Sequence, residues 1–144
     1  MRFLSRSDRK PEGRGQAGIG EAPVAYESAV AIESKVVPGV RFVINRISFG
    51  RRMELSRRIR EITQKTEFLE AGSEVNAKIE AGILSQEVDA MYLRWALVGV
   101  DGLEIDGETA TAEQLLDRGP EELAREIVVA IKEQCGLSEA ERKN

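Results

Sequence analysis

Five arginines lie close together in the segment between Val40 and Ala71 of this 144-residue chain: Arg51, Arg52, Arg57, Arg58 and Arg60. Guanidinium groups bind phosphates and carboxylates, so a helix face that carries several of them could bind nucleic acid. Glutamates also lie four residues from some of these arginines, which is the spacing of ion pairs on an exposed helix face. The pattern therefore leaves two interpretations open. We favour a solvated or protein-facing surface over a nucleic-acid interface across Arg46–Arg60.

The sequence gives little support for catalysis, phosphate binding by a glycine-rich loop, or metal binding. The chain lacks histidine, the usual general base, and its single cysteine, Cys135, falls on an apolar helix face. The run GRGQAGIG lacks the Lys-Ser/Thr of a phosphate-binding loop. Four acids lie near one another without the ligand spacing of a calcium loop: Asp101, Glu104, Asp106 and Glu108. We therefore expect no enzyme activity, no catalytic residue, no cofactor and no metal site.

Two aromatic residues could contribute to binding. Tyr92 and Trp95 are three residues apart and share one face of a predicted helix. A core position is the favoured interpretation, and an exposed anchor for a partner helix is the alternative. The candidate partner-binding residues are Arg51, Arg52, Arg58, Tyr92 and Trp95.

A β-hairpin is predicted ahead of the arginines. Two runs of alternating apolar residues flank Pro38-Gly39, which is the signature of a type II turn. The runs predict strands near residues 29–37 and 40–47.

Two long helices follow. The first, over 48–71, has an apolar stripe at helical spacing: Phe49, Met53, Ser56, Ile59, Ile62, Thr66 and Leu69. Gly72 is suited to end it, and Ser73 to cap a second helix over 73–99. The stripe of the second helix comprises Val75, Ile79, Ile83, Leu84, Val88, Met91, Trp95 and Val98. The short connection predicts an antiparallel pair.

Local signals divide the remaining chain into a turn and short helices. Asp106-Gly107 predicts a tight turn, and Thr111 with Gln114 predicts a capping box for a helix that ends near Arg118. Pro120 and the acids after it begin another helix, which ends at Gly136 and buries Leu123, Ile127, Ile131 and Cys135. A further capping box, Ser138–Glu141, begins a helix near the end of the sequence.

We therefore predict a mainly α (α+β) fold, with two long antiparallel helices, two or three shorter ones and a small N-terminal β-hairpin. Residues 1–25 are a basic arm of disordered composition, 26–137 form one helical domain with its hairpin at about 29–47, and 138–144 are a short helix start or tail. No run approaches the roughly 20 apolar residues that span a bilayer, so we expect no membrane partner.

Charge is unevenly distributed. Residues 1–65 carry 14 Lys/Arg and 7 Asp/Glu, a net of +7, whereas residues 66–144 carry 7 and 18, a net of −11. The two halves could fold onto each other with opposite charges facing. Alternatively, they could face different partners or stack head to tail between protomers.

Several segments together are similar to small proteins of tailed phages and prophages. ISFGRRMEL, TEFLEAG, MYLRWALVGVDGLEIDGETAT and AIKEQCGLSEAERKN carry this similarity, which covers roughly residues 28–144. These proteins are identified as tail assembly chaperones. The resemblance implies a largely helical, non-enzymatic protein of the host cytoplasm that coats the tape measure protein, self-associates and is absent from the mature virion. The alternatives are a nucleic-acid-binding accessory protein and a structural neck or tail-completion protein.

The family also implies a longer product made by ribosomal slippage, which would be a further partner. Arg142-Lys143-Asn144 can be encoded as CGA AAA AAC, which contains a run that allows a −1 shift. Our hypothesis is that 138–144 begin a helix completed only in that product. The gene sequence decides it, because the hypothesis needs both the slippery run and an open −1 frame beyond it.

Overall fold

The computed structural model describes residues 22–69 and 74–136, without the side chains of 66–69 and 74. The described part is mixed α/β, with four helices and two small antiparallel sheets. Its elements in chain order are β2 (Ala29–Glu33), β3 (Arg41–Asn45), α1 (Phe49–Leu69), α2 (Glu74–Ala96), β4 (Leu97–Asp101), β5 (Glu104–Ile105), β6 (Glu108–Thr109), α3 (Ala112–Arg118) and α4 (Glu121–Gln134).

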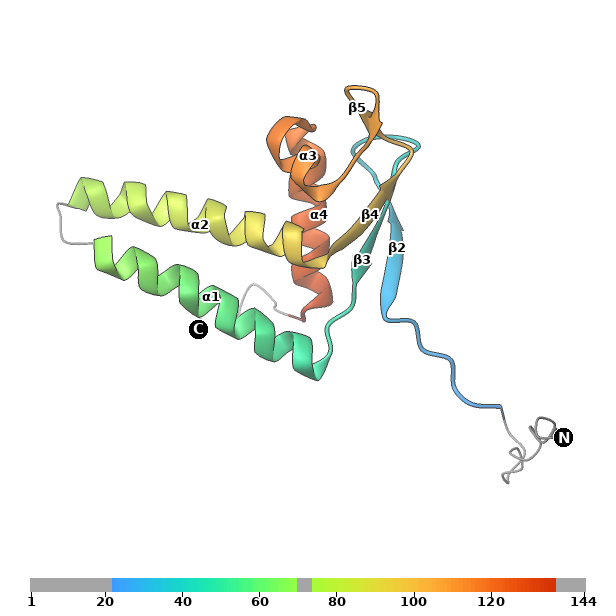
Figure 1. Cartoon of the computed structure of the whole chain (residues 1–144), viewed down its shortest axis with the longest axis horizontal. Helices are drawn as coiled ribbons and strands as arrows, with labels where there is room; N and C mark the ends of the chain where they lie inside the picture. Colours follow the sequence, from blue (N-terminus) through green and yellow to red (C-terminus); the bar gives the residue numbers. More distant parts are fainter. Residues whose placement is uncertain (1–21, 70–73, 137–144) are drawn as a thin grey trace, which may run out of the picture.

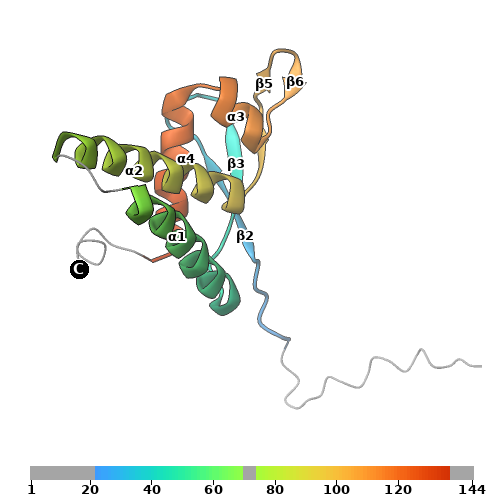
Figure 2. The same cartoon turned by 60° about the vertical axis from the view of Figure 1, so that its left-hand side comes forward.

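A three-stranded antiparallel sheet and α4 form the body of the protein. The strand order is β2-β3-β4, so β3 is central. α4 lies between this sheet and α2, whereas α1 and α2 run side by side in opposite directions and project away from the sheet (Figure 1). Figure 2 shows α3 and the β5–β6 hairpin grouped together at one end of α4. This arrangement separates a packed body from a protruding helix pair.

The core lies where β3, the C-terminal half of α2, and α4 meet. Its fully buried large side chains come from β3, α2, α3 and α4: Phe42, Ile44, Leu93, Leu115, Leu123, Ile127 and Ile131. The prediction for α4 is confirmed, because its four predicted apolar residues are all buried and Gly136 follows with φ +76°. The three- and four-residue spacing of its apolar residues therefore predicted correctly which side of α4 is buried.

The predicted hairpin is present but has shorter strands and a longer loop. The turn type is confirmed, because Val40 N donates to Val37 O and Gly39 has φ +85°. The predicted extent of the strands is wrong, since residues 34–40 form a loop that folds onto α4. There the Glu126 carboxylate accepts from Ser34 Oγ (2.7 Å) and Lys35 N (2.8 Å).

Two predictions about the long helices are wrong. The second helix ends at Ala96, because Leu97–Asp101 pair with β3 as a third strand instead of continuing the helix to Gly99. In α1 the predicted stripe begins on the wrong side, since Phe49 and Met53 are exposed and Leu55 is buried. The side of α1 that packs is therefore set by its neighbours α2 and α4.

The tight turn at Asp106-Gly107 and the capping box at Thr111 are both confirmed. Asp106 (φ +53°) and Gly107 (φ +83°) form the turn between β5 and β6. Both central residues have positive φ, as a type I′ turn requires. Thr111 Oγ1 accepts from Gln114 N, and the Gln114 side chain accepts from Thr111 N, each at 3.2 Å. The capping box therefore begins α3 as predicted.

Thr111→Ala is expected to lower the free energy of unfolding by about 1 kcal/mol, because it leaves the Gln114 N–H without its cap. Chemical denaturation followed by circular dichroism measures this change. Thr111→Ser keeps the hydroxyl and should retain most of the stability. Equal losses in both variants would contradict a capping role.

Three predictions fall outside the described residues: the Gly72–Ser73 junction, the helix start at 138–144 and most of the basic arm. Of that arm, residues 22–25 are described. They have no regular secondary structure and are exposed.

Candidate protein-binding surface

The predicted site residues lie largely at the junction of α1, α2 and α4. Arg51 Nη2 donates to Trp95 O at the end of α2 (2.9 Å), and its guanidinium carbon lies 4.2 Å from the centre of the Trp95 ring. The cation therefore both caps a helix carbonyl and stacks on an aromatic face. These two residues join α1 to the end of α2.

Arg52 makes a second such link. Its Nη2 donates to Cys135 O at the C-terminus of α4 (2.8 Å), where a positive charge complements the negative end of the helix dipole. Cys135 itself is buried, and burial raises the pKa of its thiol, although Arg52 nearby opposes this shift. The cysteine is thus the small core residue that its helical position predicted.

Arg58 lies on the outer side of α1. Its Nη2 donates to Glu54 Oε2 at 2.8 Å, and this hydrogen bond lowers the pKa of the Glu54 carboxyl. The predicted four-residue pairing is therefore confirmed here. Both side chains are substantially exposed, so the pair adds little stability.

Tyr92 is 3% exposed and belongs to the core. Its ring centre lies 5.5 Å from Lys132 Nζ, which also pairs with Asp89 at 2.9 Å. The favoured core interpretation is therefore confirmed for Tyr92, and its side chain is not accessible as an anchor.

The basic half of the chain contacts the acidic half in an unexpected way. Arg51 and Arg52 reach across to backbone carbonyls and not to carboxylates. Ion pairs between elements instead occur within the acidic half, for example Arg94–Glu113 at 2.6 Å. Two of the five clustered arginines are thereby occupied within the molecule, while Arg57 and Arg60 are exposed.

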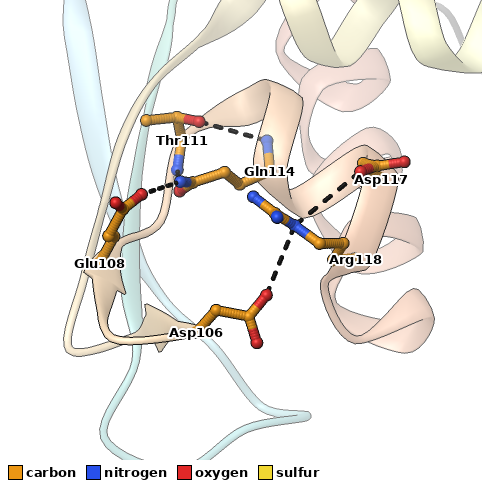
Figure 3. A network of polar contacts seen from close by, with 6 residues as sticks. All are labelled: Asp106, Glu108, Thr111, Gln114, Asp117 and Arg118. Atoms are coloured by element: carbon orange, nitrogen blue, oxygen red, sulfur yellow. Dashed lines mark hydrogen bonds and ion pairs between the residues drawn. The ribbon is translucent and has the colours of Figure 1, made fainter.

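Asp106 and Glu108, two of the four neighbouring acids noted in the sequence, are part of a polar network that links the β5–β6 hairpin to α3 (Figure 3). Gln114 Nε2 donates to Glu108 Oε1 at 2.8 Å, and Arg118 Nε lies 3.5 Å from Asp106 Oδ2. Within residues 22–69 and 74–136 no three metal-ligating side chains come together. The network holds α3 against the hairpin.

An apolar stripe is exposed along the protruding part of α2. Val75, Ile79 and Ile83 are four residues apart and 67%, 55% and 43% exposed, respectively. Their spacing places them along one side of the helix. All three belong to the apolar stripe that the sequence predicts for the second helix, and this N-terminal part of the stripe is exposed.

The stripe leads into a groove between α1 and α2. This groove has a volume of about 440 Å³, and its apolar lining comes from Ile62, Ile83, Ala90 and Met91. Polar side chains of α2, including Arg94, lie beside them. We call Val75, Ile79, Ile83 and this groove the α2 surface. Such a surface can bind an apolar side of another helix.

No helix in the described ranges is both long enough and apolar enough to cross a membrane. Comparison of the chain with protein-family models, with curated proteins and with solved structures found no match.

Proposed function

We propose that this protein is a tail assembly chaperone of a tailed phage or prophage, which binds the tape measure protein and keeps it soluble in the host cytoplasm. The observation that carries the proposal is the α2 surface, where three branched apolar side chains are exposed on a protruding helix. The sequence resemblance across roughly residues 28–144 supports the same function. Under this proposal the protein is not an enzyme, self-associates and does not remain in the mature virion.

The chemistry of the partner matches this surface. A tape measure protein is a long helical rod that needs its apolar sides covered before assembly. An amphipathic helix binds a groove through apolar residues at three- and four-residue spacing. The α2 surface offers apolar residues at the same spacing beside an apolar groove. Exposed charges on the outer side of α1, such as Arg57 and Arg60, would keep the complex soluble.

The placement of the arginines disfavours nucleic acid. Arg51 and Arg52 are hydrogen-bonded to carbonyls inside the fold, and Arg58 is paired with Glu54. Binding a phosphate backbone through these groups would cost internal contacts.

Co-expression with the tape measure protein of the same genome tests the proposal. The wild-type chain should keep that protein soluble and co-purify with it. Ile79→Asp should weaken binding by about tenfold or more, because it places a charge at an apolar contact. If the wild-type chain neither solubilises nor binds the rod, the proposed function is wrong.

A matched control separates the surface from a general effect of charge. Val129 on α4 is also 55% exposed, but it lies outside the α2 surface. Val129→Asp should bind as the wild type does. Equal loss of binding in both variants would overturn the assignment of the α2 surface, even if the protein proves to be a chaperone.

A further inference from the structure

Gly82 lies in the N-terminal half of α2, in the helix pair that projects away from the sheet (Figure 1). Glycine is less favourable than alanine in the middle of a helix, because it loses more backbone freedom when the helix forms. A positive φ angle or a close packing contact can make a glycine necessary. Gly82 has neither within the described residues: its backbone is helical, and a Cβ atom there would meet no heavy atom within 4 Å. The described part of the fold therefore makes no use of the missing side chain.

The apolar residues beside Gly82 form a ridge with a uniform step of four residues. Val75, Ile79 and Ile83 follow one another at this step, and all three are exposed. A parallel row of the helix surface lies three residues further along the chain: Lys78, Gly82 and Gln86. Because glycine has no side chain, this second row has a gap next to Ile79, three residues before it. A ridge beside such a gap is a surface into which the side chains of another helix can pack.

A long coiled-coil seam does not fit this side of α2. Such a seam alternates steps of three and four residues between apolar positions. Starting from Val75 and Ile79, the alternating steps reach Gly82 and then a glutamine. Starting from Ile79 and Ile83, they reach the same glutamine, Gln86. The uniform step of four instead favours an oblique crossing at about −50°, in which the four-residue ridges of both helices interlock.

We propose that a helix of the tape measure protein crosses α2 at Gly82, at about −50°, with one of its apolar side chains seated over the glycine. This inference rests on the proposed function, and it names the point and the angle at which the α2 surface holds its partner. The gap lets the two helix axes approach to about 8 Å, the short end of the usual range for packed helices. Ile79 and Ile83 then lie beside the seated side chain, and the apolar contact residues of the partner follow the same four-residue step.

The stability of Gly82→Ala tests whether the chain itself leaves this position free. Alanine favours the helix, and its methyl group would meet no atom of the described residues. The melting temperature, measured by circular dichroism, should therefore rise by about 2–5 °C. A lower melting temperature would show that another part of the chain packs on Gly82, and it would overturn the proposal.

Competition for the partner tests the crossing. The tape measure protein, carrying an affinity tag, is co-expressed with the full wild-type chain and a Gly82 variant. Intact mass spectrometry compares the ratio of the two chains in the purified complex with their ratio in the cell extract. Gly82→Leu should be depleted from the complex about tenfold or more, because its side chain fills the gap that the partner needs. Gly82→Ala should be depleted by a smaller factor, although it is the more stable chain.

Gly50→Leu is the matched control. Gly50 is exposed in the first turn of α1, outside the α2 surface, and a Cβ atom there would also meet no atom within 4 Å. This variant should bind as the wild type does. If Gly82→Leu binds as well as the wild type, or if both leucine variants lose binding equally, the crossing at Gly82 is wrong while the chaperone function stands. If the wild type does not bind, both proposals are wrong.

Discussion

Phe42→Ala is expected to lower the free energy of unfolding by about 3–5 kcal/mol, the largest single effect that we predict. Phe42 is 0% exposed on the central strand β3, between Ile32 on β2 and Val100 on β4. Removing the ring opens a cavity in the layer between the sheet and α4. Domains of this size are stable by roughly 5–15 kcal/mol, so the variant should lose a large part of its stability. Urea unfolding followed by circular dichroism measures the loss.

Phe49→Ala is the matched control for this variant. Phe49 begins α1 and is 85% exposed, so its replacement removes the same atoms without leaving a cavity. We expect a change within about 0.5 kcal/mol. If the two alanine variants unfold at the same urea concentration, the core assigned to β3 is wrong.

Gly102→Ala should destabilise the fold through two effects. Gly102 follows β4 with φ +87°, a conformation that strains residues with a Cβ atom. In addition, a Cβ atom there would collide with the carbonyl oxygen of Gly39 in the turn before β3. A backbone carbonyl cannot move aside as a flexible side chain can, so we expect a loss of about 2–4 kcal/mol from strain and overpacking together.

Gly107→Ala separates these two effects. Gly107 has φ +83°, nearly the same backbone conformation, but a Cβ atom there would meet no atom within 4 Å. It should therefore lose only about 1 kcal/mol, the conformational part. Thermal or urea unfolding of both variants gives the difference. A Gly107→Ala variant as unstable as Gly102→Ala would show that the close approach of the two turns contributes nothing.

Signals that act over a few residues were predicted well. Pro38-Gly39, Asp106-Gly107 and the Thr111 capping box all occupy the predicted conformations. Each depends on a φ angle or on a hydrogen bond between near neighbours in the chain. The core side of α4 was also predicted, because its apolar residues have one clear helical spacing.

The end of α2 shows why other elements were not predicted. Val98 continues the helical stripe in the sequence, but Leu97, Val98 and Val100 are also good strand residues. Pairing with β3, which lies more than 50 residues earlier, selects the strand. A local pattern cannot include that partner.

For the candidate site too, the residues were found from the sequence, but their surroundings were not. The sequence indicated a helical, non-catalytic binding protein and located its arginines and aromatics. Whether each of them is exposed depended on neighbours distant in the sequence. Arg51 and Arg52 bind carbonyls 44 and 83 residues away, and Tyr92 is buried. The sequence placed Val75, Ile79 and Ile83 in an apolar helical stripe, and they are exposed because the helix pair extends beyond the sheet and α4.

By itself, then, the sequence determined the two predicted turns, the Thr111 capping box, the glycine that follows α4, the existence of the helices and the apolar side of α4. Their causes are backbone sterics, short-range hydrogen bonds and helical periodicity, which all act within a few residues. The tertiary structure alone decided where α2 ends, which side of α1 packs and which apolar residues remain exposed. Those outcomes depend on burial against segments far away in the chain. Because the hydrophobic effect is non-directional, a local pattern does not specify which distant segment will cover an apolar residue.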